Sequence, residues 1–375
     1  MITFKFKIEA VCACAGRVSL TMIMKTLCCL FLLLSSVNSV EAQSGRTAKS
    51  VGERSATTLP KAGGAAGIET DEDVIDIRTT EVLLPVSVRE ADGRLKRDLA
   101  PENFLIYDNG VRQEITSFNK ERVPINVVLL LDASGSVYSQ MSFIRKAAIG
   151  FVHSLTAEDK VSVMQFADRV ELLQDWTPAG DTKGIDKALQ WRYHPGERTT
   201  FYDGLYLAAD EQLKKVQGRR IVVLLTDGID SSERKRVDFT QALNAIRRSE
   251  TIVYTISLTE SLRRELDEKT GGRVNRLLMG GYNKRLIAMY RAQLAEAEAN
   301  LKQLASQSGG RVFFPLEQTE LAGVYQQIAE ELRTQYLITY RPTPRSTQTQ
   351  WREIRVLVTP GGYDVSARRE YLSGI

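Results

Sequence analysis

The sequence predicts an α/β protein, in which a doubly wound, mostly parallel sheet is inserted in a small β sandwich formed by the N- and C-terminal flanks. Two short apolar runs at 126–131 and 221–225, and another buried strand expected at 251–258, predict the sheet. Parallel strands have this composition because helices cover both of their faces. Residues with helical spacing separate the runs, as a doubly wound sheet requires. At both ends of the chain apolar and polar residues alternate instead, which is typical of half-buried strands.

Length and composition fit a globular protein of roughly two domains. The 375 residues are 43% hydrophobic and 26% charged, and 50 Lys and Arg nearly balance 46 Asp and Glu. The net charge of +4 is too small to predict nucleic-acid binding. Only two histidines occur, His153 and His194. A zinc site or a histidine-based catalytic site is therefore not favoured.

Residues 1–42 are typical of a secretory signal. Lys25 precedes the apolar run LCCLFLLL, and the triplet VEA predicts cleavage after Ala42. Met22 or Met24 is an alternative start of the chain, because the residues before them are unusual for a signal. An uncleaved anchor is the competing interpretation, although the run is short for a membrane span. We expect a secreted protein, or one of the periplasm or cell envelope, with no transmembrane span after cleavage and no cysteine.

The two flanks are predicted to form one β domain. A flexible linker at 43–77, rich in Ser, Thr, Gly and Ala, precedes its first part at 78–122. There TEVLLPVSVRE places Val82, Leu84, Val86 and Val88 on one face of a predicted strand, and a hairpin is expected at Asp108-Asn109-Gly110. The second part, 336–375, contains YLITYRP, WREIRVLVTP and YDVSARREYL. Because neither part offers many strands alone, we expect them to associate into one sandwich.

The domain between these flanks, 123–335, should alternate strands and helices along the chain. A helix at 138–155 follows the first apolar run, and two adjoining strands follow it in DKVSVMQFADRVELLQDW. Another helix is expected at 203–216, before the second apolar run. Helices at 289–304 and 320–333 complete the domain, and the last runs directly into the strand YLITY.

Polar oxygen donors follow the first apolar run. Asp132, Ser134 and Ser136 occupy alternate positions in DASGS, at the carboxyl end of a predicted strand, where open α/β sheets place their ligands. Taken alone, this triplet has two interpretations, because Asp, Ser and Gly are also ordinary helix N-cap and turn residues.

Two further motifs favour a metal site. The second apolar run ends in Thr226-Asp227-Gly228, and the loop RTTFYDGL at 198–205 opens a helix between the two strands. In this order and spacing, DASGS, RTTFYDGL and LLTDG closely resemble the metal-ion-dependent adhesion site (MIDAS) of von Willebrand factor A (VWFA) domains. From LLPVSVRE to the terminal REYL, the chain also resembles bacterial secreted proteins called VWFA-related, of the acidobacterial type.

The resemblance implies that five residues form the metal site: Asp132, Ser134, Ser136, Thr199 and Asp227. Thr199 is preferred to Thr200 because the family's threonine usually lies four residues before the position held here by Asp203. Where the family often has two glycines before that threonine, this chain has Glu197 and Arg198. Hydroxyl and carboxylate oxygens suit a hard cation, so Mg²⁺ is the expected ion, with Mn²⁺ and Ca²⁺ as alternatives.

The resemblance also implies a function, because in this family the ion at such a site binds an Asp or Glu carboxylate of a partner protein. We therefore expect a non-enzymatic, extracytoplasmic module for adhesion or protein binding. One alternative is a metal-dependent hydrolase with Asp132 as nucleophile. Against it, Ser134 stands where haloacid-dehalogenase-like enzymes place a second acid, and no GxSxG elbow surrounds either serine. A structural component of the cell envelope is the other alternative.

An insertion at about 260–288 interrupts the predicted VWFA domain. Because it leaves the carboxyl end of a parallel strand, we expect it on the metal side of the sheet. Its basic residues predict either a solvated helical excursion or a positive flank that favours acidic ligands: Arg263, Arg264, Lys269, Arg273, Arg276, Lys284 and Arg285. Asp230 and Glu233 also have two interpretations, because they could touch the metal face or be only solvated.

Overall fold

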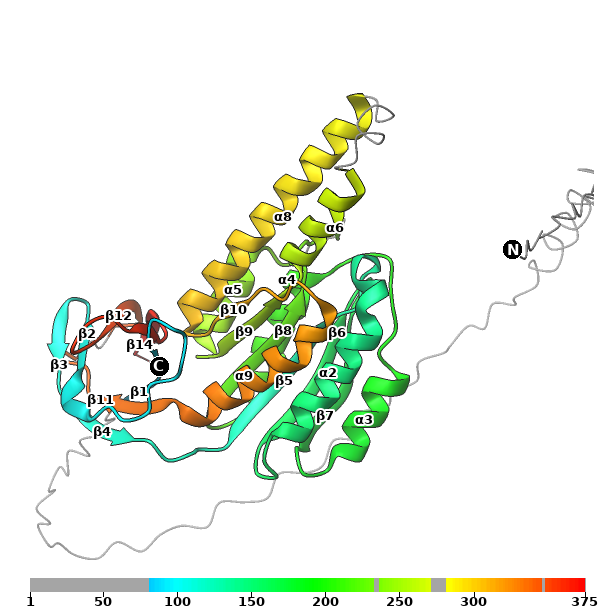
Figure 1. The fold of residues 1–375 in the computed structure, drawn as a ribbon. Helices are drawn as coiled ribbons and strands as arrows, with labels where there is room; N and C mark the ends of the chain where they lie inside the picture. Colours follow the sequence, from blue (N-terminus) through cyan, green and yellow to red (C-terminus); the bar gives the residue numbers. More distant parts are fainter. Residues whose placement is uncertain (1–80, 233–235, 271–280, 346–347, 375) are drawn as a thin grey trace, which may run out of the picture. The chain divides into compact units, whose positions relative to one another are not determined.

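The computed structural model describes residues 81–232, 236–270, 281–345 and 348–374, and for 269 and 281–283 the backbone alone. The predicted signal, the linker and Glu233 lie outside these residues. Within them, a six-stranded sheet flanked by helices is joined to two antiparallel four-stranded sheets (Figure 1). The predicted α/β fold class is thus confirmed.

The six-stranded sheet has the order β10-β9-β8-β5-β6-β7. Its strands are β5 (Ile125–Asp132), β6 (Lys160–Phe166), β7 (Val170–Pro178), β8 (Arg219–Thr226), β9 (Ile252–Ser257) and β10 (Val312–Phe313). β5 lies in the middle and pairs in parallel with both β6 and β8, whereas β7 runs antiparallel to β6. The carboxyl ends of β5 and β8 therefore meet at one edge of the sheet.

Helices cover both faces of this sheet. On one face lie α2 (Met141–Ser154), α3 (Thr182–Trp191) and α9 (Leu321–Thr334) (Figure 1). On the other lie α4 (Phe201–Leu207), the π-helix η3 (Ala208–Leu213), α5 (Phe239–Arg248) and the end of α8 (Gly281–Ser308). Neighbouring residues of β5 belong to two different cores: Leu129 packs toward α2 and α9, and Val128 toward α4 and α5. This two-sided burial explains the unbroken apolar run.

Three helices differ in extent from the sequence prediction, and the one expected at 289–304 is the longer α8 (Gly281–Ser308). The helix expected at 138–155 begins as a 3₁₀ helix, η2 (Gly135–Gln140), before α2. The helix expected at 203–216 begins at Phe201 and continues as the π-helix η3. Helix ends are the least predictable part of a pattern, because local propensity changes little over one turn.

The flanks interleave in two sheets that share one apolar core. One sheet has the order β13-β1-β11-β4 and the other β14-β12-β2-β3. Their strands are β1 (Val82–Arg89), β2 (Phe104–Asp108), β3 (Val111–Gln113), β4 (Ile115–Asn119), β11 (Tyr336–Tyr340), β12 (Gln350–Val358), β13 (Asp364–Ser366) and β14 (Glu370–Ser373). Short 3₁₀ helices precede β2 and α9: η1 (Pro101–Asn103) and η4 (Gln318–Glu320). Each sheet thus contains strands from both ends of the chain.

A buried polar network ties this sandwich to the helical domain. Arg89 of β1 forms an ion pair with Glu331 of α9, and the Tyr254 hydroxyl donates to Glu331 Oε1 at 3.1 Å. Gln335 Nε2 donates to the Tyr254 hydroxyl at 3.1 Å and to Ser87 Oγ at 3.2 Å. All five side chains are buried. The network therefore joins β1, β9 and the end of α9.

The insertion forms a pair of helices, α6 (Thr259–Thr270) and α8, which extend beyond the sheet (Figure 1). α6 begins directly after β9, so it starts at the edge where β5 and β8 end. Among the described residues, no helix has the length and apolar content needed to cross a membrane.

Candidate metal centre

Asp132 is fully buried at the end of β5 and accepts hydrogen bonds at both carboxylate oxygens. Oδ1 accepts from the Ser134 backbone N at 2.8 Å and from Ser134 Oγ at 2.6 Å. Oδ2 accepts from Thr226 Oγ1, at the end of β8, at 2.7 Å. Ser136 Oγ lies 3.0 Å from Ser134 Oγ. The tight turn after β5 thus gathers one carboxylate and two hydroxyls within hydrogen-bonding distance.

Asp227 provides a second buried carboxylate at the same edge. Its Oδ1 accepts from the Ile229 backbone N at 3.0 Å, and the nearby Ser136 hydroxyl acts to lower its pKa. Burial, and then repulsion from Asp227, raises the pKa of Asp132 to about 7. Burial likewise raises the pKa of Asp227. No Lys or Arg of the described chain pairs with either carboxylate, so the negative charge at this edge is uncompensated.

Thr199 lies on the adjoining loop and does not hydrogen-bond directly to the four residues above. Its backbone N donates to Ser231 Oγ at 2.9 Å, and its carbonyl accepts from the Ser231 backbone N at 3.2 Å. The Gly196 backbone N donates to the Ala133 carbonyl at 2.8 Å. These bonds hold the Thr199 loop between the turns that follow β5 and β8.

Glu197 and Arg198, which stand where the family often has two glycines, are held by hydrogen bonds of their backbone. The backbone N atoms of Glu197 and Arg198 donate to the carboxylate of Asp168 at 3.2 and 3.1 Å. The side chain of Thr200, by contrast, is buried with its hydroxyl unpaired, and its backbone N donates to the Ala167 carbonyl at 3.0 Å. The loop is thus anchored to the β6–β7 turn through its backbone, although the glycines are absent.

The donor set fits a hard divalent cation. Two buried carboxylates repel each other, and serine and threonine hydroxyls beside them are neutral oxygen donors of the kind that Mg²⁺ accepts. A cation between the carboxylates would lower the cost of burying their charge. Throughout the described ranges, no group of three or more His, Cys, Asp and Glu side chains could hold a metal. A site here would therefore depend on hydroxyl ligands.

Sequence reasoning named Thr226 only as part of the motif Thr226-Asp227-Gly228, without its contact to Asp132, and it missed Tyr193. Thr226 Oγ1 accepts from the Gly228 backbone N at 2.8 Å while it donates to Asp132, so it connects the two carboxylate turns. The hydroxyl of Tyr193, which is fully buried, donates to the Asp132 carbonyl. A threonine that ends an apolar strand looks like any β-branched strand residue. Nothing in the sequence pattern separates it from its neighbours.

Comparison with known proteins decides the family. Residues 126–327 match the von Willebrand factor type A domain, over more than half of the chain. The chain belongs to this family. Domains of the VWA family commonly mediate metal-dependent protein interactions and adhesion, and their MIDAS binds a divalent cation.

Other proteins are similar to parts of this VWA chain. An uncharacterized protein of Synechocystis sp. is 32% identical over 109 residues, which are 28% of this chain and 26% of that one. Proximal thread matrix protein 1 from the mussel byssus is 15% identical, with a TM-score of 0.42, over 60% of this chain and 51% of its own. A von Willebrand factor type A protein from Catenulispora acidiphila is 11% identical, with a TM-score of 0.43, over 79% and 74%. The family assignment rests on the VWA domain match.

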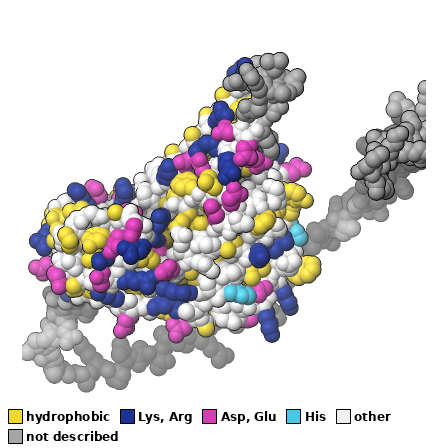
Figure 2. All heavy atoms as spheres, in the orientation of Figure 1, with side chains coloured by type: hydrophobic (Ala, Val, Ile, Leu, Met, Phe, Trp, Pro, Cys, Tyr) yellow, Lys and Arg dark blue, Asp and Glu magenta, His cyan; other side chains and the backbone are white. Residues whose placement is uncertain are grey.

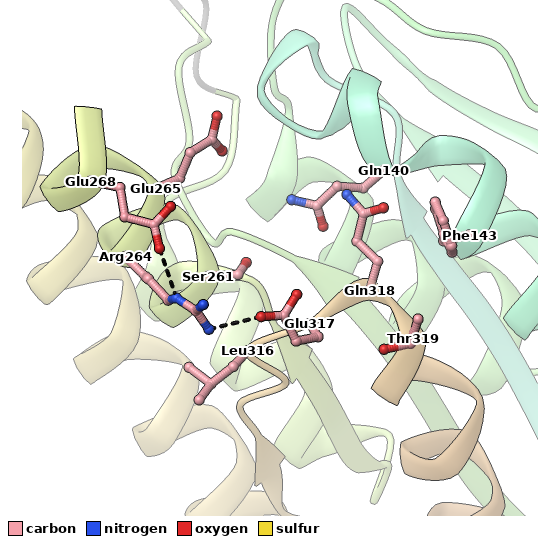
Figure 3. Close-up of a pocket in the computed structure, with 10 residues that line it drawn as sticks. All are labelled: Gln140, Phe143, Ser261, Arg264, Glu265, Glu268, Leu316, Glu317, Gln318 and Thr319. Carbon is pink, nitrogen blue, oxygen red and sulfur yellow. Dashed lines mark hydrogen bonds and ion pairs between the residues drawn. The ribbon is translucent and has the colours of Figure 1, made fainter.

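Two basic residues of the insertion, Arg263 and Arg264, are paired with acids. Figure 2 shows acidic and basic side chains side by side over α6 and α8. Arg263 pairs with Glu260 and Glu298, at 2.6 and 2.7 Å. Arg264 pairs with Glu268 and Glu317, at 3.0 and 2.8 Å (Figure 3). Arg273 and Arg276 lie outside the described residues.

Proposed function

We propose that this protein binds a divalent cation, most simply Mg²⁺, and uses it to bind an Asp or Glu carboxylate of a partner protein. The observation that carries the proposal is the pair of buried, uncompensated carboxylates, Asp132 and Asp227, connected through serine hydroxyls. Burying such a pair without a cation is costly. The arrangement is therefore more easily explained as a cation site than as a packing feature.

The proposed ligand set consists of the five residues named from the sequence: Asp132, Ser134, Ser136, Thr199 and Asp227. Thr226 and Tyr193 would orient Asp132, from its side chain and its carbonyl respectively. When bound, the ion would supply an electrophile for an incoming carboxylate. Because three of the five ligands are neutral, much of the ion's charge would remain to attract that carboxylate.

We propose a non-enzymatic role outside the cytoplasm. The predicted signal at 1–42, with cleavage after Ala42, and the linker at 43–77 support this location, and both remain sequence predictions. The β domain at 78–122 and 336–375 would then carry the VWA domain at 123–335. Mass spectrometry of the mature protein's N-terminal peptide should show Gln43 as its first residue, and any other mature N-terminus would contradict the cleavage site.

The direct test of this function is metal-dependent binding of a simple acidic probe. We would measure fluorescence anisotropy of an acetylated, amidated Gly/Ser hexapeptide with one central Asp, against the protein in Mn²⁺, in Mg²⁺ and in EDTA. Binding should require metal and should disappear when the peptide's Asp is replaced by Asn. Tight metal binding without any binding of the Asp peptide would favour a structural component of the cell envelope.

A further inference from the structure

A small pocket of about 50 Å³ lies between the VWA domain and the β sandwich. β8 begins at Arg219, whereas its pairing with β9 begins only where Ile221 meets Ile252. β9 therefore leaves the first two residues of β8 unpaired on that side, and Leu83 and Pro85 of β1 line the space beside them. One water molecule occupies roughly 10–15 Å³ by this measure. The pocket thus has room for a few waters or for one small ion.

The lining of this pocket is strongly basic. Its charged side chains are three arginines and one glutamate: Arg219, Arg220, Arg368 and Glu250. Glu250 forms an ion pair with Arg368 at 2.8 Å. Within the described chain, no carboxylate forms an ion pair with Arg219 or Arg220. The four side chains therefore carry a net charge of +2, which the pocket itself does not compensate.

Two of the three guanidiniums are buried. Arg219 is 5% exposed and Arg368 is 9% exposed, and the Nε atom of each is buried without a hydrogen-bond partner. Arg219 donates only to neutral oxygens, at the Val123 and Leu332 carbonyls and the Gln335 side chain. Burial lowers the pKa of Arg219 to about 10. Burying a charge without a counter-ion is costly, so an anion in the pocket would stabilise this arrangement.

The third guanidinium is held in place with a donor left over. Arg220 Nε donates to the Val216 carbonyl and Nη1 to the Ser249 carbonyl, both at 3.0 Å. Its Nη2 makes no hydrogen bond within the described residues. Arg368 is also held, because its Nη2 donates to the Leu83 carbonyl at 3.0 Å. Donors that are oriented before a ligand arrives lose little entropy when it binds.

We propose that this pocket binds a small divalent oxyanion of the phosphate or sulfate type, which joins the VWA domain to the β sandwich. Guanidiniums suit such ions, because their N–H groups match the oxygens in pairs. Arg220 of β8 and Arg368, which follows β13, would donate to the ion, and Arg219 would add its charge. The net charge of +2 matches a divalent ion. This inference is independent of the metal centre.

Isothermal titration with sodium phosphate tests the pocket. EDTA in the buffer keeps phosphate from binding through a metal ion, and NaCl holds the ionic strength constant. Phosphate should bind saturably, one ion per chain, with a dissociation constant in the millimolar range or below. Sulfate should compete with it, and acetate should bind about tenfold more weakly, because it carries one charge. Calorimetry is preferred to thermal unfolding here, since phosphate and sulfate also stabilise proteins that do not bind them.

Three variants connect the binding to these side chains. Arg220→Gln should weaken phosphate binding about tenfold, because it removes a charge-assisted donor from a partly exposed position. Arg248→Gln is the matched control, since it removes the same charge from an exposed residue at the nearby end of α5 that does not line the pocket. Its affinity should equal that of the wild type. Glu250→Gln should tighten binding, because it removes the carboxylate that repels the anion.

Hydrogen exchange followed by mass spectrometry tests whether the ion joins the two domains. Phosphate should slow exchange in β1 and at the start of β9 of the wild type, and should have no such effect on Arg220→Gln. Unchanged exchange at saturating phosphate would contradict the joining role.

Four results of the titrations would overturn the pocket. They are no saturable binding to the wild type, equal affinities of Arg220→Gln and Arg248→Gln, weaker binding to Glu250→Gln, and a preference for glycerol 3-phosphate over phosphate. The last would mean a site for phosphate esters, which are larger than the proposed ion. Each of these titrations is done without a divalent metal, so their failure leaves the proposed function unchanged.

Discussion

At the scale of single residues, the candidate metal centre depends on neutral hydroxyls placed around buried carboxylates. Ser134 and Thr226 donate to opposite oxygens of Asp132, so they fix the orientation of its carboxylate. Orienting groups of this kind commonly contribute tenfold to a hundredfold to metal affinity. A substitution of Thr226 therefore tests the metal centre as directly as a substitution of a proposed ligand.

Thr226→Val should weaken metal affinity about tenfold, because valine keeps the shape but cannot donate to Asp132 Oδ2. Isothermal titration with Mn²⁺ measures the change. Thr255→Val is the matched control, since Thr255 is fully buried on neighbouring β9 and its hydroxyl has no partner in the described structure. Equal affinities for the two variants would contradict an orienting role for Thr226.

The metal-free protein should lose stability as pH rises from about 4 to about 7. The pKa of Asp132 is raised to about 7 in the folded state, whereas an unfolded Asp titrates near 3.9. Between these values the folded state holds a proton that the unfolded state has released, so raising the pH favours unfolding. Urea unfolding in EDTA should show this slope, and Asp132→Asn should reduce it. A wild-type slope identical to that of Asp132→Asn would contradict the assignment.

At the scale of elements, α9 connects the VWA domain to the β sandwich through charged residues of very different burial. Glu331 is fully buried and pairs with Arg89 of β1, while the next residue toward the N-terminus, Glu330, is exposed and pairs with Arg97. Removing one partner of a buried pair leaves an uncompensated charge, whereas an exposed pair contributes little. The two adjacent glutamates therefore provide an internal comparison.

Arg89→Ala should lower the free energy of unfolding by about 3 kcal/mol or more, because it leaves the Glu331 carboxylate buried without its cation. Arg97→Ala should cost under about 1 kcal/mol. Urea unfolding followed by circular dichroism distinguishes them. Similar losses for both variants would mean that the buried network does not hold the two domains together.

The strands and the insertion differ in how far they could be predicted from the sequence. The alternation of Val82, Leu84, Val86 and Val88 predicted a half-buried strand, and all four are buried in β1. The period of two carries that information for β1, and the unbroken apolar run carries it for the two-sided burial of β5. The environment of the insertion could not be predicted in this way. The pairing of Arg264 with Glu268 follows from helical spacing, but its pairing with Glu317 joins residues 53 positions apart.

Prediction of the candidate metal centre from the sequence is limited in the same way. Asp132, Ser134 and Ser136 are close in sequence, and their turn could be read directly. Thr226 becomes important only because β8 lies beside β5 and brings it to Asp132. Sequence patterns report neighbours along the chain, and a site built from three loops needs neighbours in space.

At the scale of the whole molecule, the two ends of the chain depend on each other. β1 pairs with β11 and β13, and β2 pairs with β12, so strands from the N-terminal flank have partners from the C-terminal flank. A four-stranded sheet that loses half of its strands leaves apolar residues and backbone groups unpaired.

Ending the chain after Gln335 should therefore unfold the N-terminal flank and spare the VWA sheet. Hydrogen exchange followed by mass spectrometry should show loss of protection in β1 and β2, with β5 and β8 still protected in Mg²⁺. Retained protection in β1 would contradict the interleaved sandwich.

The most direct test of the central claim is thermal unfolding of the protein with and without Mg²⁺ or Mn²⁺. Metal that binds only the native state at about a hundredfold above its dissociation constant should stabilise it by about 2.7 kcal/mol. Asp132→Ala and Thr199→Ala should lose this response, while Thr200→Ala, which changes the neighbouring threonine, should keep it. Equal responses in the wild type, Asp132→Ala and Thr199→Ala would contradict the metal centre proposed here, as would no response in any of them.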